Sequence, residues 1–176
     1  MEHSDSIVLA AGCFWCVEAV FTSLKGVTSV VSGYSGGTIK NPCYKEICSG
    51  RTGHAEVIKI DFNPNQISLN TLYDVFFVTH NPTTLNSQGN DIGTQYRSAI
   101  FPKSEDQKQQ AVDAIKRAKA EWDDEIVTSI EDLTVFYLAE DYHQKYFALN
   151  KEAPYCNTVI APKLQKFRRR FPELLK

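Results

Sequence analysis

Residues 6–21, SIVLAAGCFWCVEAVF, decide the expected fold because they join a strand directly to a helix. Ser6 to Ala11 is a short apolar run, which is typical of a buried strand. Beyond Gly12-Cys13, apolar side chains recur at steps of three and four residues, the period of a helix face. They are Phe14, Val17, Phe21 and Leu24. We therefore expect Cys13 to lie where a buried strand passes into a helix.

Further strand and helix patterns follow this unit along the chain. Alternating or β-branched runs predict strands over residues 27–35, 54–62, 96–101 and 133–138. Helix-period runs predict helices over residues 68–78, 104–122 and 141–150, and a last helix from residue 162. We expect loops over residues 41–53, 86–95 and 151–161. This order predicts an α+β fold, a two-layer sandwich of a mixed β-sheet with packed helices and a ferredoxin-like βαββ core.

The chain has the size and composition of one folded domain over residues 1–176. Its residues are 43% hydrophobic and 23% charged, which excludes a disordered chain. A formal net charge of −2 argues against binding to nucleic acid, and we interpret the basic cluster within residues 163–170 as a solvated helix face. We expect a loop-rich C-terminal tail, about 150–176, that carries Cys156.

The sequence also bears on location. No apolar run approaches the ~20 residues that a helix needs to cross a bilayer. The apolar run at residues 7–11 is short, and the residues before it are acidic, unlike the basic start of a secretory signal. We therefore expect no membrane association and a cytoplasmic location.

Five cysteines are too few, and odd in number, for a disulfide scaffold, so redox or metal chemistry is the better interpretation. Backbone N–H groups and the dipole at a helix start favour an anion, so we expect the pKa of the Cys13 thiol to be lowered and its thiolate to be nucleophilic. An inert buried cysteine is the alternative. Phe14 and Trp15 beside it suggest a pocket for a small apolar group, although Phe14 equally suits the core.

Two other uses of the thiols remain open. Cys13-x-x-Cys16 and Cys43-x4-Cys48 together offer the four thiolates of a structural zinc site, so a zinc-bound structural module is one alternative. Cys13 and Cys16 by themselves suit a thiol-disulfide oxidoreductase, which is the other.

Acidic residues supply the remaining candidates. Strand alternation places Glu56 on the same face as Ile58 and Ile60, where burial would raise the pKa of its carboxyl and keep it protonated as an acid. A strand-end Glu56 that reaches solvent or pairs with Arg51 is the alternative. Asp91 lies in a polar, glycine-spaced loop suited to ligand binding, or to an ordinary turn.

Several blocks of the chain together resemble the A-type peptide methionine sulfoxide reductases. The blocks are Gly12-Cys13-Phe14-Trp15, Gly33-Tyr34-Ser35-Gly36-Gly37, the stretch from Tyr44 to His54-Ala55-Glu56, the stretch from Gly89 to Ser98, and Tyr155-Cys156 with the following Val159-Ile160-x-Pro162-Lys163. They extend from residue 12 to about 165. Their common order makes the resemblance specific, and it implies a single catalytic domain.

The resemblance implies a role for each candidate. The nucleophile falls on Cys13, the proton donor on Glu56, and the active-site aspartate on Asp91. The two active-site tyrosines fall on Tyr44 and Tyr96, and the methyl-binding aromatics on Phe14 and Trp15.

The implied activity is thiol-dependent reduction of methionine S-sulfoxide, free or in proteins, through a Cys13 sulfenic acid and an intramolecular disulfide. Thioredoxin or another dithiol is the implied external reductant, with no bound cofactor or metal, and we expect a monomer. Cys16 replaces the glycine most common in the family, Cys43 lies outside its usual pattern, and the tail carries only Cys156. We favour Cys156 as the resolving thiol, with Cys16 as the alternative, and assign no role to Cys43, Cys48, His80 or His143.

Overall fold

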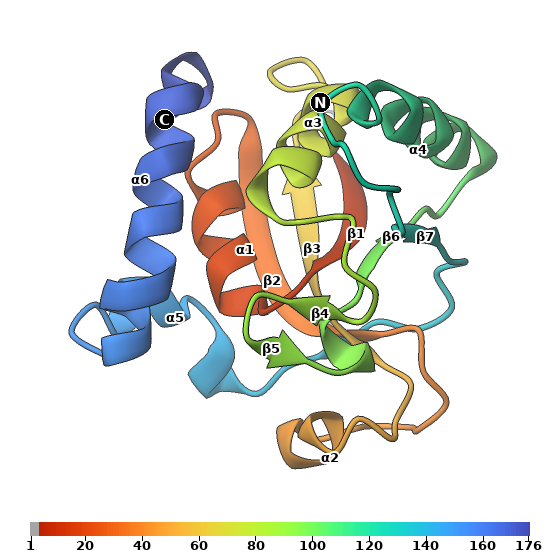
Figure 1. Cartoon of the computed structure of the whole chain (residues 1–176), viewed down its shortest axis with the longest axis vertical. Coiled ribbons are helices and arrows are strands. Elements are labelled where there is room, and N and C mark those ends of the chain that lie inside the picture. The colour runs from red at the N-terminus through yellow and green to blue at the C-terminus, as the bar shows by residue number, and fades with distance from the viewer. Residues whose placement is uncertain (1–3) are drawn as a thin grey trace.

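The computed structural model describes residues 4–176 and has a six-stranded sheet at its centre (Figure 1). The strand order is β7-β6-β1-β3-β2-β8, and every neighbouring pair is antiparallel except β6 and β7. These strands are β1 (Asp5–Ala11), β2 (Val27–Ser35), β3 (Ala55–Phe62), β6 (Ser98–Phe101), β7 (Ser129–Ile130) and β8 (Tyr137–Leu138). The central order β6-β1-β3-β2 is that of a ferredoxin-like sheet, so the predicted α+β fold with a βαββ core is confirmed.

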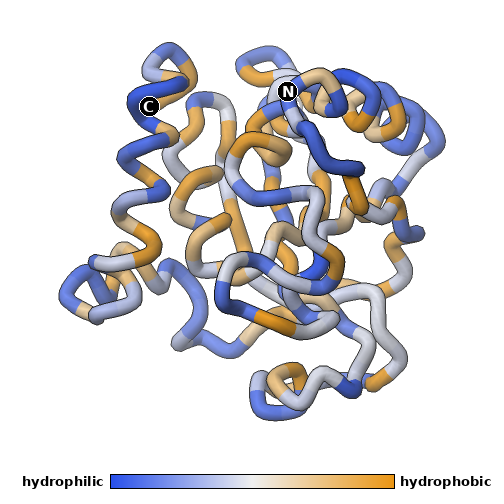
Figure 2. The backbone as a smooth tube through the Cα atoms, viewed as in Figure 1, coloured by the Kyte–Doolittle hydropathy of each residue, from blue (hydrophilic) through white to orange (hydrophobic). Residues whose placement is uncertain are grey.

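Helices cover one face of this sheet. The main ones are α1 (Phe14–Thr22), α3 (Leu69–Thr79), α4 (Glu105–Ala118) and α6 (Ala161–Arg170). Alternate side chains of β1, including Ile7 and Leu9, point into the core formed with these helices. Apolar residues accordingly follow the central strands and the inner sides of the helices, while the outer sides of α4 and α6 are hydrophilic (Figure 2). Of the helices in residues 4–176, none is long and apolar enough to span a bilayer.

The other face of the sheet is covered by irregular chain. Val8, Ala10 and Val57 form a smaller apolar cluster on this face, against which Leu133 and Phe136 pack. The predicted strand over residues 133–138 is therefore mostly wrong, because its apolar side chains cover the sheet instead of pairing with an edge. Within it only β8 pairs as a strand, and β7 lies outside every predicted strand.

Gly12 makes the sharp connection between β1 and α1. Its φ is +84°, in the region that favours glycine, and a Cβ at this position would lie 2.6 Å from Cγ of Gln88. The turn allows Cys13 to occupy the N-cap position of α1, as the sequence predicts.

Two predicted loops contain regular structure, and one predicted helix is broken. The loop over residues 41–53 includes α2 (Tyr44–Cys48). The loop over residues 86–95 includes a hairpin of β4 (Ser87–Gln88) and β5 (Asp91–Ile92), followed by a 3₁₀ turn (Thr94–Tyr96). The predicted helix over residues 141–150 is broken into a 3₁₀ turn (Asp141–His143) and α5 (Tyr146–Leu149), because Lys145 adopts a left-handed conformation with φ +53°.

The C-terminal segment differs most from its prediction. Residues 154 and 155 are helical, Cys156–Ile160 forms a π-helical turn, and α6 continues directly from it, ahead of a last 3₁₀ turn (Pro172–Leu174). The expected loop-rich tail is therefore wrong, and Cys156 is fully buried. The segment is helical because Ile160, Leu164 and Phe167 recur at helical spacing and bury one face.

Candidate active site

Cys13 opens into a cavity of about 350 Å³ between α1, the β4–β5 hairpin and the start of α6. Its lining includes Cys16, Gln88, Asp91, Tyr155 and Lys163. Cys13 is partly exposed at the N-cap of α1, with no side-chain capping bond that would occupy its sulfur. The cavity therefore brings a thiol together with acidic, phenolic and amide groups.

Glu56 lies on β3 and is buried, with 2% of its surface exposed. Its Oε1 accepts a hydrogen bond of 3.2 Å from the backbone N–H of Phe14, while Oε2 is buried without a partner among residues 4–176. Burial, followed by the charges of Asp91 and Cys16, raises the pKa of Glu56 to about 8, against the lowering effect of the Phe14 hydrogen bond. The predicted burial and upward pKa shift are confirmed, and the solvent-exposed alternative is wrong.

The pKa values of the Cys13 and Cys16 thiols depend on one another, because the two thiols lie in one buried cluster. The interaction with Cys16, burial and the charge of Glu56 raise the pKa of Cys13 above its ordinary value. The same interaction lowers the pKa of Cys16 to about 7 against the effect of burial, with help from Lys163. The lowered pKa expected for Cys13 is therefore wrong.

Tyr44 and Tyr96 come from separate elements, α2 and the 3₁₀ turn after β5, and lie close enough to Glu56 to feel its charge. Burial raises the pKa of both phenols well above the ordinary value, and the charge of Glu56 raises both further. At Tyr44 an interaction with the Cys48 thiol also raises the pKa. Both hydroxyls therefore remain protonated and able to donate.

Asp91 reaches the site from β5 of the hairpin. Its Oδ2 accepts a hydrogen bond of 3.4 Å from the Tyr155 hydroxyl, which also lies 3.7 Å from Sγ of Cys16. Tyr155 thus links the carboxylate of Asp91 to the thiol pair.

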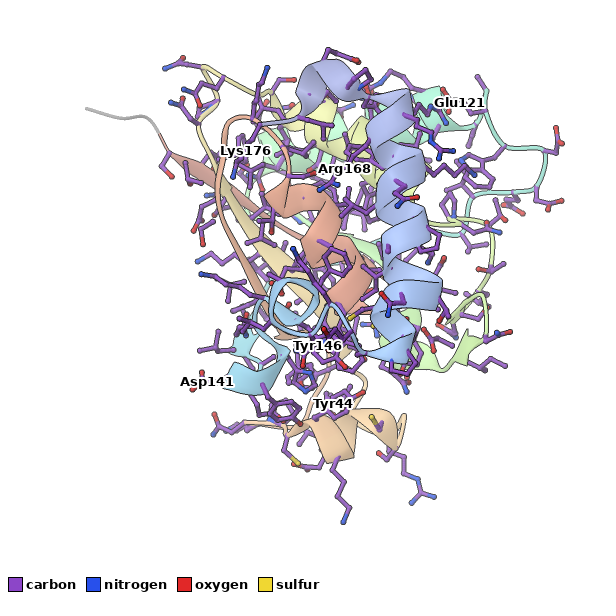
Figure 3. The ribbon with its side chains drawn as sticks, turned by 90° about the vertical axis from the view of Figure 1, so that its left-hand side faces the viewer. Tyr44, Glu121, Asp141, Tyr146, Arg168 and Lys176 are labelled. Carbon is purple, nitrogen blue, oxygen red and sulfur yellow. The ribbon has the colours of Figure 1, made fainter. Side chains whose placement is uncertain are left out.

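Trp15 lies in an aromatic cluster next to Cys13. Its ring stacks on Tyr146, with centroids 3.9 Å apart and planes 10° apart. Its Nε1–H donates a hydrogen bond of 3.0 Å to Nδ1 of His143. Phe14 is almost fully buried, with its ring 5.1 Å from His143 and 6.5 Å from Trp15, so it belongs to the core as well as bordering the site. Tyr44 and Tyr146 lie at the same end of the molecule (Figure 3).

Sequence reasoning missed several residues of the site. Tyr155, Tyr146 and His143 contact the candidates described above, although His143 had been given no role. Glu140 was also missed: it accepts hydrogen bonds from the Tyr34 hydroxyl and from the backbone N–H of Tyr44, both 3.0 Å long. The density of aromatic and acidic residues in the stretch 140–147 is the signal that could have revealed them.

The remaining cysteines separate into two places. Cys156 packs with Cys16 and Cys13 in one buried cluster. Cys43 and Cys48 are exposed at the two ends of α2. Across residues 4–176 no group of three or more Cys, His, Asp or Glu side chains could hold a metal ion, so the zinc alternative has no support from the geometry.

The site combines a paired thiol at a helix start with a buried neutral carboxyl group and two protonated phenols. On a ferredoxin-like sheet, this combination defines a thiol-based oxidoreductase that can protonate its substrate. The family model for peptide methionine sulfoxide reductase matches residues 5–175. The chain belongs to this family, in its A-type branch, and is a peptide-methionine (S)-S-oxide reductase.

Named relatives and solved structures agree with this assignment. The peptide methionine sulfoxide reductase MsrA of Erwinia tasmaniensis is 57% identical over 96% of this chain and 95% of its own, and that of Deinococcus radiodurans is 49% identical over 98% and 84%. The reduced form of Mxr1 from Saccharomyces cerevisiae superposes with a TM-score of 0.83 at 37% identity, covering 87% of this chain and 89% of that one. Mxr1 in complex with Trx2 superposes with a TM-score of 0.59 at 27% identity, covering 81% and 84%.

Proposed function

We propose that Cys13 is the nucleophile that reduces methionine S-sulfoxide, free or in proteins, and that Glu56 is its proton donor. The observation that carries this proposal is the buried Glu56, which is bonded through Phe14 to the first turn of the Cys13 helix and has a pKa of about 8. A sulfoxide sulfur is a poor electrophile until its oxygen is protonated. Glu56 supplies that proton, and Tyr44 and Tyr96 hold the oxygen as hydrogen-bond donors.

The chemical step transfers oxygen and two electrons. The Cys13 thiolate attacks the substrate sulfur, the protonated oxygen passes to the Cys13 sulfur as the sulfur–oxygen bond of the substrate breaks, and methionine leaves. The sulfoxide is reduced to a thioether while Cys13 is oxidised to a sulfenic acid. The Cys16 thiolate, which forms first because of its lower pKa, accepts the Cys13 proton as Cys13 attacks.

Substrate orientation rests on the aromatic side chains beside the thiol. Trp15 is partly exposed next to Cys13, and Phe14 lies behind it. In our proposal these rings bind the methyl group of the substrate, and Asp91 with Tyr155 holds its polar part.

Resolution of the sulfenic acid has two candidate thiols in the same cluster as Cys13. Cys16 is favoured by its contact with Cys13 and by its pKa of about 7, which supplies thiolate at neutral pH. Cys156 is fully buried and burial raises the pKa of its thiol. The segment that carries Cys156 is helical instead of loop-rich, so we propose that Cys16 attacks first, with release of water, and that Cys156 follows by disulfide exchange.

Thioredoxin then reduces the final disulfide, in line with the solved complex of the yeast relative with Trx2. We propose that the enzyme works without a bound cofactor and as a monomer, one catalytic unit. A cycle that regenerates a free thiol also suits the reducing cytoplasm.

The decisive experiment compares substrates in a dithiothreitol-driven assay. The purified protein should reduce the S epimer of a methionine sulfoxide ester and leave the R epimer unchanged, and Cys13→Ser should remove all turnover. A thiol-disulfide oxidoreductase would instead reduce insulin disulfides and would not need Glu56, so insulin reduction in the Glu56→Ala variant separates the two functions.

A further inference from the structure

Glu18 is a buried carboxylate that the proposed mechanism does not use. It lies on α1, one turn after Trp15, with 4% of its surface exposed. Its Oε2 accepts a hydrogen bond of 2.6 Å from the Ser32 hydroxyl, and its Oε1 accepts one of 2.5 Å from the backbone N–H of Lys145. Buried carboxylates are rare without partners, and these two partners join α1 to β2 and to the segment before α5.

Gln144 binds the same serine from the other side. Its Nε2 donates 2.9 Å to the carbonyl of Ser32, and its Oε1 accepts 2.9 Å from the backbone N–H of Ser32. The amide therefore pairs with β2 as a neighbouring strand would, and every polar atom of Ser32 has a partner in Glu18 or Gln144.

The backbone between these anchors is held in an unfavourable conformation. Lys145 has φ +53°, which few residues other than glycine adopt. This kink separates the 3₁₀ turn, which ends at His143, from α5, which begins at Tyr146. The hydrogen bond from Glu18 fixes the N–H of the kinked residue itself.

Both residues that flank this anchored pair contact Trp15. His143 accepts the indole Nε1–H at 3.0 Å, and Tyr146 stacks on the indole at 3.9 Å. His143 is fully buried, and its Nε2 has no hydrogen-bond partner among the described residues. The imidazole is therefore held by the hydrogen bond between its Nδ1 and the Trp15 indole. The position of the indole therefore depends on where residues 143–146 are held.

We propose that Glu18, Ser32 and Gln144 form a clasp that positions His143 and Tyr146 against Trp15 and so fixes the indole face that receives the substrate methyl group. The inference rests on the proposed role of Trp15. The clasp residues are positioning residues, because they act through the kink at Lys145 and touch neither substrate nor Cys13.

The clasp has a kinetic signature. Trp15 binds a part of the substrate that does not react. Displacement of the indole therefore weakens the binding of the ground state and of the transition state alike, which raises KM with little change in kcat. Losing one or two hydrogen bonds at the clasp corresponds to roughly a 5- to 20-fold rise in KM. The emission of Trp15 should shift to longer wavelength as the indole leaves its stack and meets water.

The test uses Glu18→Ala, Glu18→Gln and Ser32→Ala, each in a Trp122→Phe background so that Trp15 alone is observed. Glu18→Ala should raise KM for free methionine S-sulfoxide and red-shift the emission, while alkylation of Cys13 by iodoacetamide keeps its parent rate. Glu18→Gln should restore both readouts, because its amide oxygen accepts from Lys145 and its NH2 group donates to Ser32. Matched controls are Glu152→Ala, an exposed glutamate, and Ser29→Ala on the same strand.

A folded Glu18→Ala protein with lowered thermal stability but parent KM and emission would overturn the clasp. Should Glu18→Ala not fold, Ser32→Ala decides the matter with an expected KM rise of about 3-fold, and an unchanged KM and emission there overturns the clasp. If the unsubstituted protein fails to reduce the sulfoxide, the proposed function fails, while the emission shift in the Trp122→Phe background still reports on the clasp independently.

Discussion

The backbone N–H of Phe14 donates a hydrogen bond of 3.2 Å to Oε1 of Glu56, across 42 residues of sequence. This bond joins the first turn of α1 to β3, one of the two central strands of the sheet. It holds the acid beside Cys13.

Glu56→Gln should keep much more activity than Glu56→Ala. The glutamine Oε1 can still accept from Phe14 and its Nε2 can still donate to the sulfoxide oxygen, whereas alanine removes both groups. We expect a loss within about 10-fold for glutamine and about 100-fold or more for alanine in single-turnover rate. Rapid-quench measurement of methionine release tests this, and equal losses in both variants would exclude an oxygen-binding role for Glu56.

Glu56 should also make the stability of the protein depend on pH. Its folded pKa of about 8 lies above the unfolded value near 4.5, so the folded state holds this proton more tightly. The stability that it contributes is fully present below about pH 4.5 and is lost progressively as the pH rises to about 8. Glu56→Gln should therefore melt above the parent at pH 9, with the gap closing toward pH 5. A constant gap across this range, by differential scanning calorimetry, would argue against a titrating Glu56.

Cys16 should carry the first thiolate of the buried pair. In a Cys43→Ser/Cys48→Ser background, absorbance at 240 nm should show one ionisation near pH 7. Cys16→Ser should abolish this step, because burial and the charge of Glu56 raise the pKa of Cys13, which then ionises at higher pH. Persistence of the step near pH 7 in Cys16→Ser would assign the first thiolate to another cysteine.

The order of disulfides should distinguish the two resolving thiols. After one turnover, mass mapping of Cys156→Ser should reveal a Cys13–Cys16 disulfide, while Cys16→Ser should accumulate Cys13 sulfenic acid, trapped by dimedone. Thioredoxin-driven cycling should fall in both variants, with one equivalent of sulfoxide still reduced. A Cys13–Cys156 disulfide formed at the parent rate in Cys16→Ser would instead make Cys156 the first resolving thiol.

Each phenol should contribute separately to the chemical step. Tyr44→Phe and Tyr96→Phe each remove one donor to the sulfoxide oxygen, while their rings and the Tyr44 backbone bond to Glu140 remain. We expect about a 10-fold loss of single-turnover rate for each and a larger loss for the double variant. If the double variant turns over at the parent rate, neither hydroxyl holds the oxygen.

The sequence by itself determined the features that depend on local periodicity. A period of two along β3 places Glu56 on the same face as Ile58 and Ile60, and an apolar run followed by a helical period places Cys13 at the N-cap of α1. These conclusions needed no knowledge of distant chain, because backbone dihedrals and side-chain direction are set by near neighbours. For the same reason the central strands and the capping of α4 by Ser104 were predictable.

Only the tertiary structure decided which distant groups meet. His143 lies 128 residues from Trp15 and was given no role from the sequence, yet it holds the indole. The sequence predicts a loop-rich tail around Cys156, but packing of Ile160 and Leu164 makes that segment helical and buries its thiol beside Cys16. The pKa of Cys13 likewise depends on Cys16, on burial and on Glu56 rather than on its helix position alone. Such contacts and charges arise from the packing of whole elements, whose relative placement no short stretch of sequence encodes.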